Sequence, residues 1–225
     1  ANEDDSDVIV MGTRGRRSVH RALLGSVAEE VVRRAEQPVL AVQRGEDDVR
    51  AVTPPPPIER ILVPVDFSDH AREALRHAHG LAALYGAGID LLHVTEPDLH
   101  PAFYGGGLDG TYDIEKEQKA EEELHAFYED ITDTVHLEGQ LPDRSMVEVH
   151  VAAGRPAAEI LQFAEEQGSD LVVMSTHGLT GLKRFMMGSV AEKVVRHVSV
   201  PVFTVKAFGK SLVEPAAAEP RETGR

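Results

Sequence analysis

The sequence predicts an α/β protein whose main domain is a doubly wound, five-stranded parallel sheet. Short apolar runs alternate with longer amphipathic segments over residues 58–206. Short apolar runs bounded by turns are typical of buried parallel strands, and their alternation with helices implies right-handed crossovers within one sheet. A second observation supports this fold class, because the last part of the pattern is present twice in the chain.

The first half of the main domain begins with a predicted strand over residues 61–65. Ser68 and Asp69 follow it and are suited to cap the helix that we expect to continue to about Tyr85. Two glycines, Gly86 and Gly88, end this helix, and residues 89–94 form the second strand. The pattern therefore predicts a strand–helix–strand unit.

The second half of the domain continues the alternation after a long loop over residues 97–112, which is rich in Gly, Pro and aromatic residues. Loops of this length are commonly functional or mobile. The remaining predicted elements, in order, are a helix over 114–135, a strand over 147–151, a helix that starts at Pro156, a strand over 171–174, a helix over 190–198 and a strand over 202–205.

An internal repeat relates residues 7–43 to residues 170–206 without gaps, at a constant offset of 163. Identical pairs include Asp7/Asp170, Met11/Met174, Gly15/Gly178, Gly25/Gly188, Ser26/Ser189, Ala28/Ala191, Glu29/Glu192 and Pro38/Pro201. A fixed-offset match of this length indicates a duplication. The first copy carries only the last two strands and the last helix of a domain.

The repeat and the composition together predict four segments. Residues 1–44 are the C-terminal half of a domain, residues 45–57 a proline-rich linker, residues 58–206 a complete domain, and residues 207–225 a disordered tail. A half-domain of this size buries little core by itself. We therefore expect it to dock on the complete domain, or to complete itself from another chain by swapping.

Composition narrows the function classes. The formal net charge is −15, which disfavours nucleic-acid binding, and no apolar run approaches the ~18 residues of a membrane span. The chain has no cysteine, so neither disulfides nor thiol chemistry are expected, and a reducing cytoplasmic location fits. The acidic excess is interpreted either as an ordinary solvated surface or as the adaptation of a halophile to a high-salt cytoplasm.

A loop with phosphate-binding chemistry follows the strand that both copies share. In the first copy it carries Gly12, Gly15 and Gly25-Ser26, and in the complete domain it carries Ser175, Gly178 and Gly188-Ser189. Glycines at a strand end allow backbone N–H groups to approach a phosphate, and a helix N-terminus favours anions. In open α/β sheets ligands bind beyond the carboxyl ends of the strands, where these residues lie.

These motifs resemble the ATP-binding type of the universal stress protein family. The resemblance rests on the spacing G-x2-G-x9-G-S, on GSVAE, on a Gly-x-Pro before the third helix and on the stretch IERILVPVDFSDHA. It implies a Rossmann-like fold of the adenine nucleotide alpha hydrolase type, and ATP, AMP or ADP as ligand, with Mg as a further expectation. It also implies edge-to-edge pairing through the last strand, residues 39–42 with residues 202–205 in an intrachain pseudo-dimer, or the same strand in a homodimer. The nucleotide-binding residues that it implies are Pro64, Val65, Asp66, Val94, Met174, Ser175, His177, Gly178, Gly188, Ser189 and Val190.

Each copy departs from the family pattern at one point. Ser175 replaces the first loop glycine of the complete domain, and the first copy keeps Gly12 but has no upstream strand ending in an aspartate. We expect a stress-response module that binds an adenine nucleotide, or a structural module of the same fold with an empty pocket. No catalytic residue is assigned, because a Walker lysine and a nucleophile–base pair are missing. A weak ATPase would depend on His177.

The eleven histidines do not suggest a metal site in the sequence. His77 and His79 are two residues apart on a helix, and five more lie on different elements: His93, His100, His125, His136 and His150. We interpret them as surface or strand-end residues.

Overall fold

The structure is a computed structural model, and it describes residues 6–13, 25–43, 56–96, 114–134, 146–178, 187–207 and 209–212. The elements in chain order are β1 (Ile9–Gly12), α1 (Ser26–Arg34), β2 (Val39–Val42), β3 (Arg60–Val65), α2 (Asp69–Tyr85), β4 (Gly88–Thr95), α3 (Ile114–Thr134), β5 (Val147–Ala153), α4 (Pro156–Glu166), β6 (Leu171–Ser175), α5 (Ser189–His197) and β7 (Val202–Val205).

One seven-stranded sheet runs through the described molecule in the order β1-β2-β7-β6-β3-β4-β5. The strands of the complete copy, β3 to β7, are parallel throughout, and so are β1 and β2. The predicted α/β class with a doubly wound parallel sheet is confirmed. The sheet is wider than the five predicted strands because the two strands of the first copy continue it.

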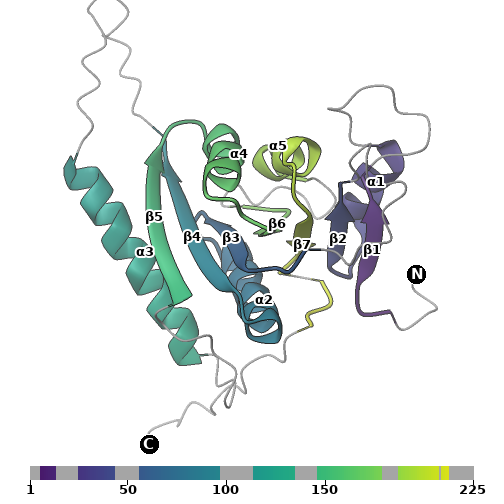
Figure 1. Ribbon diagram of the computed structural model, residues 1–225, viewed down its shortest axis with the longest axis horizontal. Helices are drawn as coiled ribbons and strands as arrows, with labels where there is room; N and C mark the ends of the chain where they lie inside the picture. The colour runs from purple at the N-terminus through teal and green to yellow at the C-terminus, as the bar shows by residue number, and fades with distance from the viewer. Residues whose placement is uncertain are drawn as a thin grey trace, which may run out of the picture.

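Helices cover both faces of this sheet (Figure 1). On one face α2 and α3 bury a core that includes Leu75, Leu124 and Val173. On the other face α4 and α5 bury a second core that includes Leu62, Ile160 and Val194, and Ala28 of α1 belongs to it. The predicted apolar runs become the central strands because both of their faces are covered.

Local sequence signals set the helix ends. The Ser68 hydroxyl accepts a hydrogen bond from the backbone N–H of Ala71 at the start of α2. Gly86 ends α2 in the left-handed conformation with φ 68°, which glycine adopts without a Cβ clash. Pro156 is the first residue of α4, where its missing N–H leaves no helical hydrogen bond unmade.

The first copy joins the complete copy by an antiparallel pairing of their last strands. Leu40 of β2 faces Phe203 of β7, and these two residues occupy the same position in the repeat. The pair on one side, Val39 with Thr204, is equivalent to the pair on the other side, Val202 with Ala41, when the two copies are exchanged. The junction is therefore a local pseudo-twofold, and it is the intrachain arrangement among the two that we expected. The homodimer stays a prediction.

Polar contacts on either side of the junction follow the same pseudo-symmetry. Lys206 donates from Nζ to the carbonyls of Arg33 and Ala35 at the end of α1, at 2.8 and 2.6 Å. Gln43, its equivalent in the first copy, donates from Nε2 to the Val195 carbonyl near the end of α5, at 3.3 Å. Burial lowers the pKa of the Lys206 amine to about 8. Each copy thus caps the final helix of the other.

The predicted disordered tail is wrong for the stretch 209–212. The Lys210 backbone N–H donates to the Glu36 carbonyl at 2.7 Å, and its amine pairs with Asp7 at 2.7 Å. The Leu212 backbone N–H donates to His77 Nε2 at 3.1 Å. This short segment therefore ties the first copy to α2. Residues 213–225, and residues 45–55 of the predicted linker, lie outside the described residues.

Candidate functional site

A pocket of about 350 Å³ opens at the carboxyl ends of the strands in the complete copy. It lies at β3, which has β4 on one side and β6 on the other in the sheet. The strand order therefore reverses here, because the chain builds β4 and β5 on one side of β3 and then β6 and β7 on the other side. This is the switch point at which open α/β sheets bind ligands. The pocket is lined by all the residues predicted for the complete domain: Pro64, Val65, Asp66, Val94, Met174, Ser175, His177, Gly178, Gly188, Ser189 and Val190.

The N-terminus of α5 forms one end of the pocket. Gly188 is its N-cap residue and offers no side-chain cap, and its own N–H donates to the Thr176 carbonyl at 2.8 Å. Ser189, Val190 and Ala191 line the pocket in the first turn, where backbone N–H groups have no helical acceptor. This end of the pocket therefore presents hydrogen-bond donors and the positive end of a helix dipole.

Ser175 closes a tight turn at the end of β6. Its Oγ accepts a hydrogen bond from the His177 backbone N–H at 3.1 Å, which ties the loop back on itself. The Thr176 hydroxyl lies 2.9 Å from His177 Nδ1, and the His177 side chain is buried. The serine that departs from the family pattern thus has a structural partner in this loop.

Asp66 stands between the start of α2 and the loop after β6. Its Oδ1 accepts hydrogen bonds from the backbone N–H of Ser68 at 3.1 Å and from the Ser68 hydroxyl at 2.6 Å. A Cβ added at Gly178 would overlap Asp66 Oδ2. A side chain at position 178 would therefore require the Asp66 carboxylate to move.

The sequence-based prediction missed part of the pocket wall. The additional lining residues are Ala71, Leu92, His93, Glu96, Pro156, Ile160, Thr176 and Ala191. Two of them could have been found, because Leu92 shares a strand face with Val94 and Ile160 lies one helical turn after Pro156. Thr176 and Ala191 also adjoin predicted residues in the sequence, whereas Ala71 of α2 reaches the pocket only through the tertiary fold.

The equivalent loop of the first copy lies apart from this pocket. Gly12 ends β1, Gly25 is the N-cap of α1, and Ser26 opens that helix. The Gly25 N–H donates to the Thr13 carbonyl at 2.8 Å, the same bond that Gly188 makes to Thr176. Gly15 lies outside the described residues. The local geometry of the loop is repeated, while the strand that carries Asp66 has no counterpart among the described residues of the first copy.

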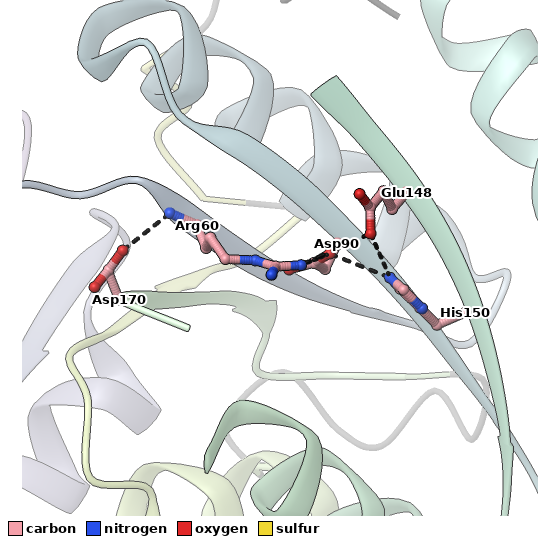
Figure 2. A network of polar contacts seen from close by, with 5 residues as sticks. All are labelled: Arg60, Asp90, Glu148, His150 and Asp170. Carbon is pink, nitrogen blue, oxygen red and sulfur yellow. Dashed lines mark hydrogen bonds and ion pairs between the residues drawn. The ribbon is translucent and has the colours of Figure 1, made fainter. Parts of the chain in front are cut away.

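A polar network occupies the opposite, amino-terminal ends of the strands (Figure 2). The buried Asp90 accepts hydrogen bonds from Arg60 at 2.8 and 3.1 Å and lies 3.1 Å from His150 Nε2. The bond to Asp90 raises the pKa of Arg60, whose backbone N–H also donates to Asp170 at 3.0 Å. Asp90, His150 and Glu148 are close enough to share a metal ion, but the Arg60 guanidinium already engages both Asp90 oxygens.

The surface interpretation of the histidines is wrong for two of them. His77 and His79 are buried, at 2% and 0% exposure. His77 lies against Phe203 of β7, whereas His79 lies against Tyr128 of α3. Burial lowers the pKa of both, that of His79 to about 4. They belong to the packing of α2 and are remote from any cluster of metal ligands in the described residues.

No helix in the described part of the chain combines the length and apolarity that crossing a membrane requires.

Comparison with known proteins matches residues 1–43 and 57–206 to the model of the universal stress protein family. Universal stress protein MJ0531 of Methanocaldococcus jannaschii is 34% identical over 150 residues, which are 66% of this chain and 82% of that protein. Universal stress protein Rv2005c of Mycobacterium tuberculosis is 30% identical over 203 residues, 90% of this chain. The chain spans 63% of the length of Rv2005c.

Solved structures agree with this assignment. A universal stress protein from Archaeoglobus fulgidus matches with a TM-score of 0.59 at 28% identity, over 90% of this chain and 63% of that one. The structure of MJ0577 matches with a TM-score of 0.52 at 30% identity, over 67% of this chain and 97% of that one. With the family model covering most of its length, this chain belongs to the universal stress protein family.

Proposed function

We propose that the complete copy binds an adenine nucleotide, ATP, ADP or AMP, in the pocket at the carboxyl ends of β3, β4 and β6. The observation that carries this proposal is the convergence of an uncapped helix N-terminus, an apolar wall and a carboxylate around one cavity of about 350 Å³. A volume of this order is typical of small-ligand sites. The protein acts as a binding or regulatory module of a stress response.

The phosphates are assigned to the end formed by α5. The free backbone N–H groups of Ser189, Val190 and Ala191 supply donors, and the Ser189 hydroxyl can supply another. Gly178 and Gly188 leave room for close approach of the phosphate to the backbone. The Ser175 hydroxyl accepts from His177, so its proton stays available for donation to a ligand oxygen.

The base and ribose are assigned to the other end of the pocket. Leu92, Val94, Ile160 and Met174 provide an apolar wall for a planar ring. The Asp66 carboxylate lies at the rim of this wall and is suited to accept hydrogen bonds from a ribose hydroxyl or from an amino group. An apolar wall with few oriented polar groups is typical of nucleotide base pockets.

Catalysis is not part of the proposal. Among the described residues that line the pocket there is no lysine, and no group of three metal-ligating side chains lies there. Efficient phosphoryl transfer depends on such charges to stabilise the transition state. If the protein hydrolyses ATP slowly, His177 is the candidate residue to position the attacking water. Mg²⁺, if it takes part, would be held mainly by the phosphates.

A regulatory role is supported by the position of α5. Its N-terminus faces the pocket, while its C-terminal half contacts the first copy through Gln43 and through an ion pair of Arg196 with Glu29 at 3.9 Å. Nucleotide at one end of α5 can therefore bias the docking of the first copy at the other end. A cytoplasmic location, consistent with a chain without cysteine, belongs to the same proposal.

The test begins with nucleotide release from the purified protein by denaturation and its identification by chromatography and mass spectrometry. Calorimetric titration with ATP, ADP, AMP and, as control, GTP follows, with and without Mg²⁺. We expect adenine nucleotides to bind with micromolar to submillimolar affinity. No binding at millimolar ATP would contradict the proposal and favour a structural module with an empty pocket. A Ser175→Gly variant then decides whether the serine is the obstacle.

A further inference from the structure

Phe67 has an unusual backbone for a bulky residue. Its φ is 61°, in the left-handed region, and it is the only residue other than glycine with a positive φ in the described part of the chain. A side chain with a Cβ is disfavoured there, and such strain persists only where the surroundings impose it. Phe67 lies between Asp66, which lines the pocket, and Ser68, which caps α2.

Two aromatic contacts hold Phe67 in this conformation. Its ring packs against His93 with 4.4 Å between centroids and a tilt of 36°, and it meets Phe127 edge-on at 5.7 Å. His93 is itself fixed, because its Nδ1 donates to the Val65 carbonyl at 2.8 Å. The guanidinium of Arg72 lies 4.7 Å over the Phe127 ring. The ring of Phe67 is therefore clamped between β4 and α3.

The left-handed turn determines where the Asp66 carboxylate lies. Because the chain reverses at Phe67, the backbone N–H and the hydroxyl of Ser68 both reach Asp66 Oδ1. The second carboxylate oxygen then packs on Gly178 across the pocket rim. Relaxation of residue 67 to a negative φ would redirect the chain between β3 and α2 and separate Ser68 from Asp66.

We propose that Phe67 is a positioning residue for the nucleotide site, and that its clamped left-handed backbone holds the Asp66 carboxylate at the pocket. This inference rests on the proposed nucleotide binding. The affinity for the adenine nucleotide is then set by the backbone conformation at position 67 and not by the size of its side chain.

Four substitutions at position 67 separate these two roles. Gly and Asn tolerate the left-handed region, whereas Ala and Leu do not. We expect Phe67→Gly and Phe67→Asn to bind ATP within about threefold of the unmodified chain, and Phe67→Ala and Phe67→Leu to bind about tenfold more weakly. A pure packing role predicts the opposite order, with Leu, the largest replacement, binding best and Gly worst.

A double-mutant cycle tests whether the loss of ATP affinity at position 67 acts through Asp66. In an Asp66→Ala background, Phe67→Ala is expected to have no further effect on ATP affinity, because the group that it positions is gone. An undiminished loss in that background would overturn the proposal.

A second readout requires no nucleotide. The Ser68 amide, which donates to Asp66, is expected to exchange its hydrogen about tenfold faster in the Ala and Leu variants than in the Gly and Asn variants. If the unmodified chain bound no ATP, the proposed function would fail, and the exchange order would still decide the positioning role. Equal exchange in all four variants, or slower exchange in the Leu variant than in Gly, contradicts it.

Discussion

The two copies of the strand–helix–strand unit have nearly the same local structure and different surroundings. Val173 in β6 of the complete copy is 0% exposed beneath α2, whereas its equivalent Val10 in β1 is 63% exposed. Both loops make the same bond from the N-cap glycine to a threonine carbonyl. Only the complete copy adds β3, α2 and Asp66, and only there do the loop residues line the pocket described above. The local motif thus follows from its own residues, while the pocket depends on β3 and α2.

The largest expected difference concerns the two equivalent valines. Val173→Asp places a charge in the core between β6 and α2, and it should lower the free energy of unfolding by more than about 4 kcal/mol. Val10→Asp should change it by less than about 0.5 kcal/mol, because the side chain is already exposed. Urea denaturation followed by circular dichroism measures both. A Val10→Asp variant as unstable as Val173→Asp would mean that β1 is covered in solution.

Acid should destabilise the complete copy through His79 on α2, the helix that has no counterpart in the described part of the first copy. Burial lowers the pKa of His79 to about 4 from an ordinary 6.5. The unfolded chain therefore binds more protons between these values, so stability is complete above pH 6.5 and falls as the pH drops toward 4. The loss is about 3 kcal/mol.

His79→Leu should remove this component of the acid sensitivity. Unfolding free energies measured from pH 7.5 to 4.5 check it, with His197→Leu, at an exposed position of α5, as the matched control. Equal pH profiles for the unmodified chain and His79→Leu would contradict the assignment.

The junction between the copies should be asymmetric in strength. Lys206→Met removes two hydrogen bonds at the end of α1 and is expected to cost about 2 kcal/mol. Gln43→Leu removes the longer bond of 3.3 Å to the Val195 carbonyl at the end of α5 and should cost about 1 kcal/mol or less. Hydrogen exchange of the β2 amides reports the docking directly. A larger effect from Gln43 would reverse the account of the junction.

The loop glycines are tested through nucleotide affinity and not through the stability of the fold. Gly178→Ala forces a Cβ against Asp66 and should weaken ATP binding about tenfold, or about 1.4 kcal/mol. At Gly188 the added Cβ would lie 3.3 Å from the Thr176 carbonyl, so Gly188→Ala should weaken binding less. Gly25→Ala in the first copy is the control and should leave the affinity unchanged.

Much of the fold was predictable because its strands are buried on both faces. The apolar run Ile61–Val65 lies within β3. The predicted bounds of α2 and α5, and the predicted start of α4, agree with the structure within one or two residues. The pairing of β2 with β7 was one of two arrangements expected from the family resemblance and from the small core of a half-domain. These features depend on local pattern and on the repeat.

Other features depend on contacts between distant residues. His77 and His79 point to different neighbours, and both are buried because α2 packs on the sheet and on α3 at once. The left-handed backbone at position 67 could not be predicted, because the residue there is Phe and not Gly. Its cause is the contact of the Phe67 ring with His93 and Phe127 in the folded chain. The composition of the tail predicted disorder throughout. Residues 209–212 are nevertheless held in place, because they bond to Glu36 and His77, which are far away in the sequence.

The most direct test of the account is the stoichiometry of adenine nucleotide binding to the full chain, measured by calorimetry on protein freed of bound ligand. The pocket of the complete copy predicts one nucleotide per chain, with an affinity that falls in Gly178→Ala and is unchanged in Gly25→Ala. Two nucleotides per chain would show that the first copy binds without β3 and Asp66. No binding, or binding that Gly178→Ala leaves intact, would contradict the assignment of the site.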